Sequence, residues 1–160
     1  MAYLLDTNVF IDAKARHYGL DFCPGFWDWL AVAGQSGSVA SIIQVRRELQ
    51  DDELDDWLDA LGANFFRQPD VQVLEAMARV SQWIDSQPFT PAAKTTFFDA
   101  ADYHLIAHTL AGKHVLVTHE QIEHTQARIK IPNVCIEMNV PYMRTHEMLR
   151  SERVRLILAK

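Results

Sequence analysis

Neither disulfide bonds nor a membrane span is expected, because the chain has few cysteines and no long apolar run. The only cysteines, Cys23 and Cys135, lie far apart in the chain and form no zinc-type pair. Free thiols in a cytoplasmic protein are the simpler interpretation. No apolar run approaches the length that crosses a membrane. The charge at Asp6 comes too early for a signal peptide.

Basic residues are also in deficit, since 15 Lys and Arg stand against 21 Asp and Glu and give a formal net charge of −6. Proteins that coat nucleic acid non-specifically rely on many contacts between Lys or Arg and phosphate, so the composition argues against that class. The composition does not exclude a nuclease whose acidic residues bind metal and whose few basic residues guide the nucleic-acid strand. The chain has no repeat and no long Gly/Ser linker, so we predict one domain over residues 1–160.

Short apolar segments alternate with helical patterns, which predicts an α/β fold with a small parallel sheet. Strands are expected at residues 3–5, 114–118 and 140–143. Helices are expected at residues 7–11, 25–33, 42–49, 51–61, 71–84, 99–111 and from 145 onward, whereas 91–97 is predicted to be a loop or a short helical turn. The expected N-caps are Thr7 or Asn8, Ser41 and Asp99, each for the helix that follows it.

Acidic residues stand at the edges of four apolar segments, where a carboxylate is costly unless it is paired or bound to metal. Asp6 ends the first strand, Glu48 lies on the helix 42–49, Asp102 lies near the start of the helix 99–111, and Glu120 follows the strand 114–118. Sites in parallel sheets form at the carboxyl ends of strands, where Asp6 and Glu120 fall. Converging carboxylates need a cation, and hard oxygen ligands suit Mg²⁺ or Mn²⁺.

Each of these acids also has a simpler explanation when it is taken alone. Asp6 is a suitable N-cap, and Glu48 beside two arginines is a suitable solvated residue. Asp102 and Glu120 are acids of the kind favoured in the first turn of a helix. What favours a common site is the order of all four along the chain, with two of them at strand ends.

That order resembles the PIN-domain nucleases, which include the VapC-type toxins of bacterial toxin–antitoxin pairs. The matching segments cover roughly residues 3 to 143 and are Leu4–Asn8 with Phe10–Asp12, Val45–Leu49, Ala101–Ala107 and Val115–Glu120. Most of the family ends the last motif with aspartate, where this chain has Glu120. The resemblance implies a three-layer α/β/α fold around the small parallel sheet and a metal-dependent endoribonuclease activity that hydrolyses phosphodiester bonds.

The resemblance also implies roles for individual residues. One or two Mg²⁺ or Mn²⁺ ions would activate water and offset charge on the phosphate oxygens. Asp6 and Asp102 are the expected direct ligands, Glu48 completes the cage or orients water, and Glu120 holds a second ion. Hydrogen bonds to carboxylates, phosphate or water are expected from Thr7, Asn8 and Thr118; Asp99 is a cap or an extra ligand, with the cap favoured. Contacts to the RNA backbone are expected from Arg46, Arg47 and Lys130, with Lys94 and Arg128 as further candidates.

The implied partners are an RNA substrate, a cognate antitoxin of a type II pair and a second copy in a homodimer, with no membrane partner. One rival hypothesis is a PIN-like binding module that has lost activity. Another is a zinc hydrolase using His119, Glu120 and His124, although HExxH requires histidines at i and i+4 and these lie at i and i+5. The tryptophans are predicted as core rather than base-stacking residues. The acidic run 51–59 is either a solvated face or a dock for a basic partner.

Overall fold

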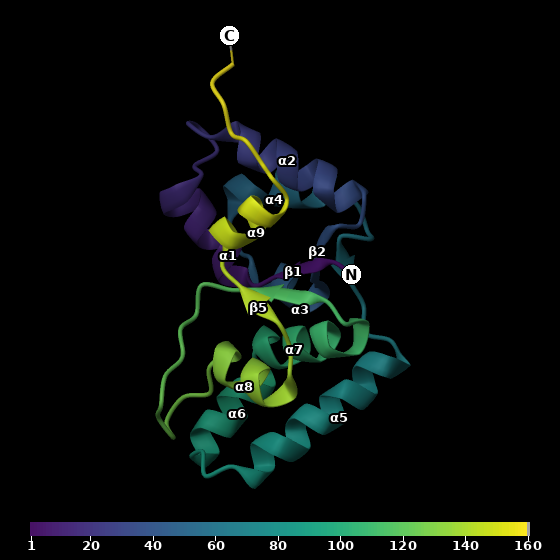
Figure 1. The fold of residues 1–160 in the computed structure, drawn as a ribbon, viewed down its shortest axis with the longest axis vertical. Coiled ribbons are helices and arrows are strands. Elements are labelled where there is room, and N and C mark those ends of the chain that lie inside the picture. Colours follow the sequence, from purple (N-terminus) through teal and green to yellow (C-terminus); the bar gives the residue numbers. More distant parts are fainter. Residues whose placement is uncertain (160) are drawn as a thin grey trace.

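A five-stranded sheet lies at the centre of the molecule, with helices on both faces (Figure 1). This computed structural model describes residues 1–159, so Lys160, the last residue of the predicted domain, lies outside the described residues. The strands are β1 (Tyr3–Leu5), β2 (Val39–Ile42), β3 (Phe66–Arg67), β4 (Val115–Val117) and β5 (Tyr142–Met143). All neighbouring strands pair in parallel, in the order β3-β2-β1-β4-β5. The predicted α/β class with a central parallel sheet is confirmed.

The helices form a layer on each face of the sheet (Figure 1). One layer holds α1 (Thr7–Asp12), α2 (Pro24–Gln35), α4 (Asp52–Ala60) and α9 (Thr145–Ser151). The other holds α5 (Val71–Ser86), α6 (Pro91–Asp99), α7 (Ala101–Gly112) and α8 (Ile131–Met138). A π-helical turn, η1 (Ala13–His17), continues α1, and α3 (Ile43–Glu48) follows β2 directly. This is the three-layer α/β/α arrangement that was predicted.

The hydrophobic core lies between the sheet and these two layers. Strand residues such as Leu4, Leu5 and Leu116 have no exposed surface, because helices cover both faces of the sheet. Trp27 is buried in the α2 side of this core and its indole N–H donates to the Tyr18 carbonyl at 2.6 Å, so the prediction that it is a core residue is confirmed. No helix within residues 1–159 combines the length and the apolar character needed to cross a membrane.

The strand order places a topological switch point between β1 and β4. From β1 the chain moves outward through β2 to β3, and β4 then returns to the opposite side of β1 before β5 completes the sheet. In open parallel sheets the crevice outside the carboxyl ends of such a strand pair is where ligands bind. Asp6 follows β1, and the segment from Thr118 to Glu120 follows β4, so this crevice is lined by polar residues.

Two local predictions are wrong at residues 39–42. Ser41 is not a helix cap but a residue of β2, and its hydroxyl donates to the Leu5 carbonyl at 2.6 Å. Helix α3 therefore begins at Ile43, with no side-chain cap. The strand was missed because a short apolar run that is buried on both faces carries no periodicity to separate it from a helix.

Two further predictions are wrong around Asp99. Residues 91–99 form the nine-residue helix α6, where a loop or a short helical turn over 91–97 was predicted. Thr90 caps this helix, and its hydroxyl accepts from the Ala93 N–H at 3.1 Å. Asp99 is the last residue of that helix and caps nothing, because Ala100 is extended and α7 starts at Ala101. Asp99 and Asp102 consequently belong to different helices and do not share a helical face.

Candidate active site

Asp6 is the most deeply buried of the four predicted acids, with 3% of its surface exposed. It stands at the junction of β1 and α1, where its carboxylate accepts from the Thr7 N–H at 2.7 Å. Asp6 is thus the N-cap of α1, and the prediction of Thr7 or Asn8 as that cap is wrong. The Thr118 hydroxyl donates to the second Asp6 oxygen at 2.8 Å, which ties the ends of β1 and β4 together.

Glu48 joins this group from the last residue of α3. The Thr7 hydroxyl donates to one of its oxygens at 2.7 Å, and the Ala101 N–H donates to the other at 2.9 Å. Since Ala101 is the first residue of α7, Glu48 acts as a cap for a helix that starts 53 residues later. Thr7 donates to a carboxylate, as the sequence suggested.

Glu120 caps the N-terminus of α8, as Glu48 caps that of α7. Its carboxylate accepts from the N–H of Ile131, the first residue of that helix, at 2.8 Å. Its own N–H donates to the Thr118 hydroxyl at 3.1 Å, and the Lys130 ammonium lies 3.8 Å from its other oxygen. The N-termini of α1, α7 and α8 therefore each meet one carboxylate, where the positive end of the helix stabilises negative charge.

Asp102 differs from the other three. It lies in the first turn of α7, and within residues 1–159 no hydrogen bond or ion pair reaches its carboxylate. Its pKa is raised to about 8, chiefly by burial and then by the negative charges of Asp6, Glu120 and Glu48, against a lowering by Lys130. Its surroundings thus include all the other predicted acids.

Asp6 shows the same mutual repulsion. Its pKa is raised to about 7, chiefly by burial and in part by the charges of Glu120 and Glu48, while the hydrogen bonds from Thr118 and the Thr7 N–H lower it. The structure therefore brings together the four acids that the sequence singled out. Asn8 lies beside them, since its amide accepts from the His119 N–H at 3.1 Å.

The donor chemistry of the group suits a hard divalent cation, because it offers carboxylate oxygens in a partly buried place. The unpartnered carboxylate of Asp102 is the observation that most favours such an ion. As the side chains lie, however, no set of three or more His, Cys, Asp or Glu residues in the described part of the chain encloses a metal position. The oxygens of Asp6, Glu48 and Glu120 are turned toward helix N–H groups instead.

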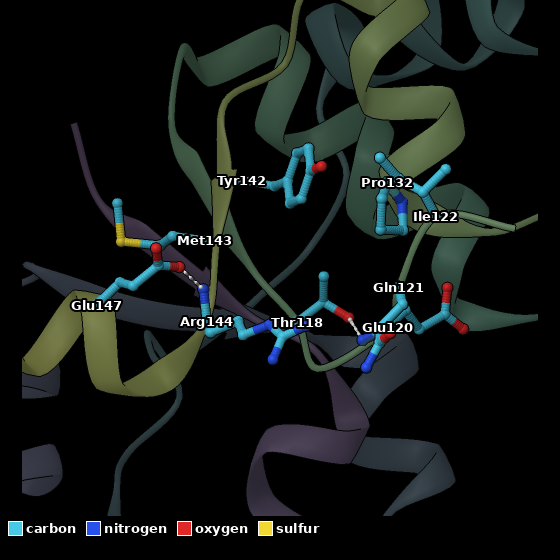
Figure 2. Close-up of a pocket in the computed structure, with 9 residues that line it drawn as sticks. All are labelled: Thr118, Glu120, Gln121, Ile122, Pro132, Tyr142, Met143, Arg144 and Glu147. Atoms are coloured by element: carbon cyan, nitrogen blue, oxygen red, sulfur yellow. Dashed lines mark hydrogen bonds between the residues drawn. The ribbon is translucent and has the colours of Figure 1, made fainter.

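A cavity of about 380 Å³ lies beside α6, next to two of the four acids. Asp102 and Glu120 line it together with the basic residues Arg128 and Lys130. Glu120 also borders a second cavity of about 480 Å³, formed with β5 and the start of α9. Figure 2 shows the Glu120 carboxylate pointing away from Tyr142 and Arg144 of this second cavity. Glu120 therefore separates the two hollows.

The predicted RNA-contacting residues have different surroundings. Lys130 lies at the acids, whereas the Arg46 guanidinium is paired with Asp55 at 3.2 Å and with Asp59 at 2.9 Å. Arg47 is exposed. Lys14 similarly pairs with Asp51 at 2.7 Å, so part of the acidic run 51–59 is neutralised within the chain.

His119 holds the turn between Thr118 and Glu120. Its Nδ1 lies 2.7 Å from the Asp12 carboxylate and its Nε2 lies 2.6 Å from the Thr145 hydroxyl. Sequence inspection missed these partners because they come from α1 and α9. The zinc hypothesis loses its geometric basis, because residues 119–130 form no helix and Glu120 and His124 have no helical face to share.

Comparison with known proteins gives one match. A family model described as "Domain of unknown function (DUF4411)" matches residues 3–156. No curated protein and no solved structure matches the chain. The matched range runs from β1 past α9 and includes all four acids of the site.

Proposed function

This chain belongs to the DUF4411 family, a domain of unknown function, and we propose that it is a PIN-type endoribonuclease that requires Mg²⁺ or Mn²⁺. The observation that carries the proposal is the meeting of carboxylates from four separate segments at the switch point of a parallel sheet. Two of these carboxylates, Asp6 and Asp102, have pKa values raised by burial and by the charges of neighbouring acids. Such values are concentrated at functional sites.

Helix capping alone explains three of the acids. Asp6, Glu48 and Glu120 each accept a hydrogen bond from the N-terminus of a helix. Capping does not explain Asp102, which is largely buried among like charges without a partner in the described chain. A buried, charged carboxylate without a partner destabilises the fold unless a cation binds to it. The surroundings of Asp102 therefore support a cation-binding function.

In the proposed reaction, water adds to phosphorus and one P–O bond breaks, which leaves a phosphate end and a hydroxyl end. A divalent ion, when bound, lowers the pKa of water and offsets negative charge on the phosphate oxygens. Asp6 and Asp102 would hold the ion, and Thr118 keeps the Asp6 carboxylate in place. Lys130, beside Glu120, would offer its ammonium group to the phosphate.

Cleavage assays on the purified chain test this proposal. Wild-type protein should cut RNA in Mg²⁺ or Mn²⁺ and lose that activity in EDTA. Asp6→Asn and Asp102→Asn should each lower turnover by roughly a hundredfold or more while the circular dichroism spectrum stays unchanged. The matched control is Asp28→Asn, an exposed residue of α2. Turnover that persists in EDTA or in both site variants would refute the assignment.

A non-catalytic PIN-like binding module is the second candidate. It is favoured by the absence, within residues 1–159, of an enclosed metal position and by the capping role of three of the acids. Such a module would bind no divalent ion at these carboxylates and would cut no RNA. Mn²⁺ binding therefore separates the two candidates even before a cleavable RNA is found.

The biological role that we propose is that of the toxin in a type II toxin–antitoxin pair, with a cognate antitoxin as partner and a homodimer as the working form. This role rests on the resemblance of the sequence motifs to VapC-type toxins. Controlled expression in bacteria tests it: growth should stop on induction of the wild type and continue with Asp6→Asn. Normal growth with both proteins would contradict the role as a toxin.

A further inference from the structure

The second cavity, of about 480 Å³, has the features of a ligand site, and apart from Thr118 and Glu120 its lining residues lie outside the acidic site. It lies between the end of β4, the residues after it, β5 and the start of α9, as Figure 2 shows. Its volume falls within the range of roughly 300–1,000 Å³ that is common for small-molecule sites. Glu120 forms part of its wall, so a molecule seated there lies next to the acidic site.

The walls of this cavity offer one aromatic ring, one cation, a small apolar surface and the carboxylates of Glu120 and Glu147. Tyr142 is half-buried, and Figure 2 shows its ring beside the hollow, with its hydroxyl directed toward Pro132 and Ile122. Within residues 1–159 neither the Tyr142 hydroxyl nor the Gln121 amide has a hydrogen-bond partner. Both groups are therefore free to contact a ligand.

Arg144 supplies the cation. It is exposed, and in the described part of the chain no carboxylate pairs with its guanidinium group. Its backbone N–H donates to Glu147 at 2.8 Å, which fixes this residue at the rim (Figure 2). Arginine in such a place recognises phosphate through parallel N–H donors.

We propose that this cavity binds one nucleotide of a nucleic-acid strand, with the base stacked on Tyr142 and a phosphate held by Arg144. Base–aromatic stacking tolerates any base, and the Gln121 amide can donate to and accept from a base edge. That this nucleotide is the one next to the scissile phosphate rests on the proposed function. Because Glu120 separates the two cavities, the strand would pass it on the way from the base site to the acids.

Binding assays with two matched probes test the base site without relying on cleavage. The probes are a fluorescein-labelled RNA of about ten nucleotides and random sequence, and an abasic ribose-phosphate chain of the same length. Fluorescence anisotropy in EDTA gives their affinities for the full chain. Wild-type protein should bind the RNA roughly tenfold more tightly than the abasic chain, which is the size expected for one stacked base.

Variants then assign that difference to the cavity. Tyr142→Leu should bind both probes equally, and Tyr142→Phe, which keeps the ring, should retain the roughly tenfold preference. Arg144→Gln should weaken binding of both probes by a similar factor, whereas Arg150→Gln, an exposed arginine farther along α9, should change neither. Circular dichroism confirms that each variant is folded.

The outcomes are distinct from those of the nuclease proposal. A wild type without preference for bases, or Tyr142→Leu with the preference intact, overturns the base site. A base preference that depends on Tyr142, in a protein that binds no Mn²⁺ and cuts no RNA, supports the base site and refutes the nuclease. Arg144→Gln with unchanged affinity for both probes overturns the phosphate contact.

Discussion

At the residue scale, the four acids differ in what holds them. Asp6, Glu48 and Glu120 have hydrogen-bond donors from the protein, whereas the described chain gives Asp102 only burial and like charges. The sequence predicted that all four would meet, because of their order along the chain and because two of them stand at the ends of strands. It predicted the hydroxyl donors Thr7 and Thr118. It did not predict the backbone N–H donors of Ala101 and Ile131, because they come from segments that local patterns do not connect.

The raised pKa values predict how the stability of the metal-free protein depends on pH. Asp6 and Asp102 have folded pKa values of about 7 and about 8, against an ordinary value of 3.8 for the carboxyl of aspartate. The folded state therefore binds more protons than the unfolded state between pH 4 and 8. The contribution of these two protonated carboxyls to the free energy of unfolding is fully present below pH 4 and is lost as the pH rises through 7 and 8.

Thermal unfolding in EDTA between pH 5 and 8.5 measures this effect. The wild-type Tm should fall with rising pH, and the fall should be shallower in Asp102→Asn, which has one less proton to lose. Asp28→Asn serves as the control and should follow the wild type. A Tm that rises toward pH 8, or equal slopes for wild type and Asp102→Asn, would contradict the raised pKa values.

At the element scale, helices are anchored by side chains from other elements. Helix α7 is capped by Glu48 of α3, and α8 is capped by Glu120 from the loop after β4. The sequence predicted most helices correctly but misassigned 39–42 and 91–99. A short buried strand shows no period, and the signal of Thr90 followed by Pro91 at the start of a helix was overlooked.

Removing the remote cap should weaken α7. Glu48→Ala leaves the Ala101 N–H without its acceptor and should lower the free energy of unfolding by about 1 kcal/mol. Glu75→Ala, at an exposed position of α5, is the control and should change it little. Urea denaturation measures both variants in EDTA. Equal midpoints for Glu48→Ala and the control would show that the capping contact does not contribute.

His119 links three elements and should matter more for stability. Its ring bonds Asp12 of α1 and Thr145 of α9 while its backbone follows β4. His119→Phe keeps a ring but leaves both partners unpaired, so unfolding should become easier by roughly 2 kcal/mol. His146→Phe, at an exposed position of α9, should have little effect. If urea denaturation shows the two variants to be alike, the ring contacts carry no stability.

At the scale of the whole molecule, the strand order creates the site. β1 and β4 are neighbours although more than a hundred residues separate them, and their carboxyl ends bring Asp6 and Thr118 into contact at 2.8 Å. The sequence predicted a parallel sheet from its alternating segments. It did not predict the order of the strands, because β2 was not recognised and β3 is two residues long and carries no pattern of its own.

The negative charge of the whole chain favours binding of a cation. The formal net charge is −6, so a divalent ion bound at the acids reduces the repulsion between negative charges in the protein. Because Asp6 and Asp102 hold protons near neutral pH, an ion that binds there must release them. The heat of binding should consequently depend on the buffer that takes up those protons.

Isothermal titration of the full chain with Mn²⁺ at pH 7, in Tris and in PIPES, tests the central claim most directly. We expect wild type and Asp28→Asn to bind the ion, with heats that differ between the two buffers, and Asp6→Asn and Asp102→Asn to give no binding heat. A wild type that binds no Mn²⁺, or one whose binding survives in both site variants, would contradict the claim that these carboxylates form a metal-dependent active site.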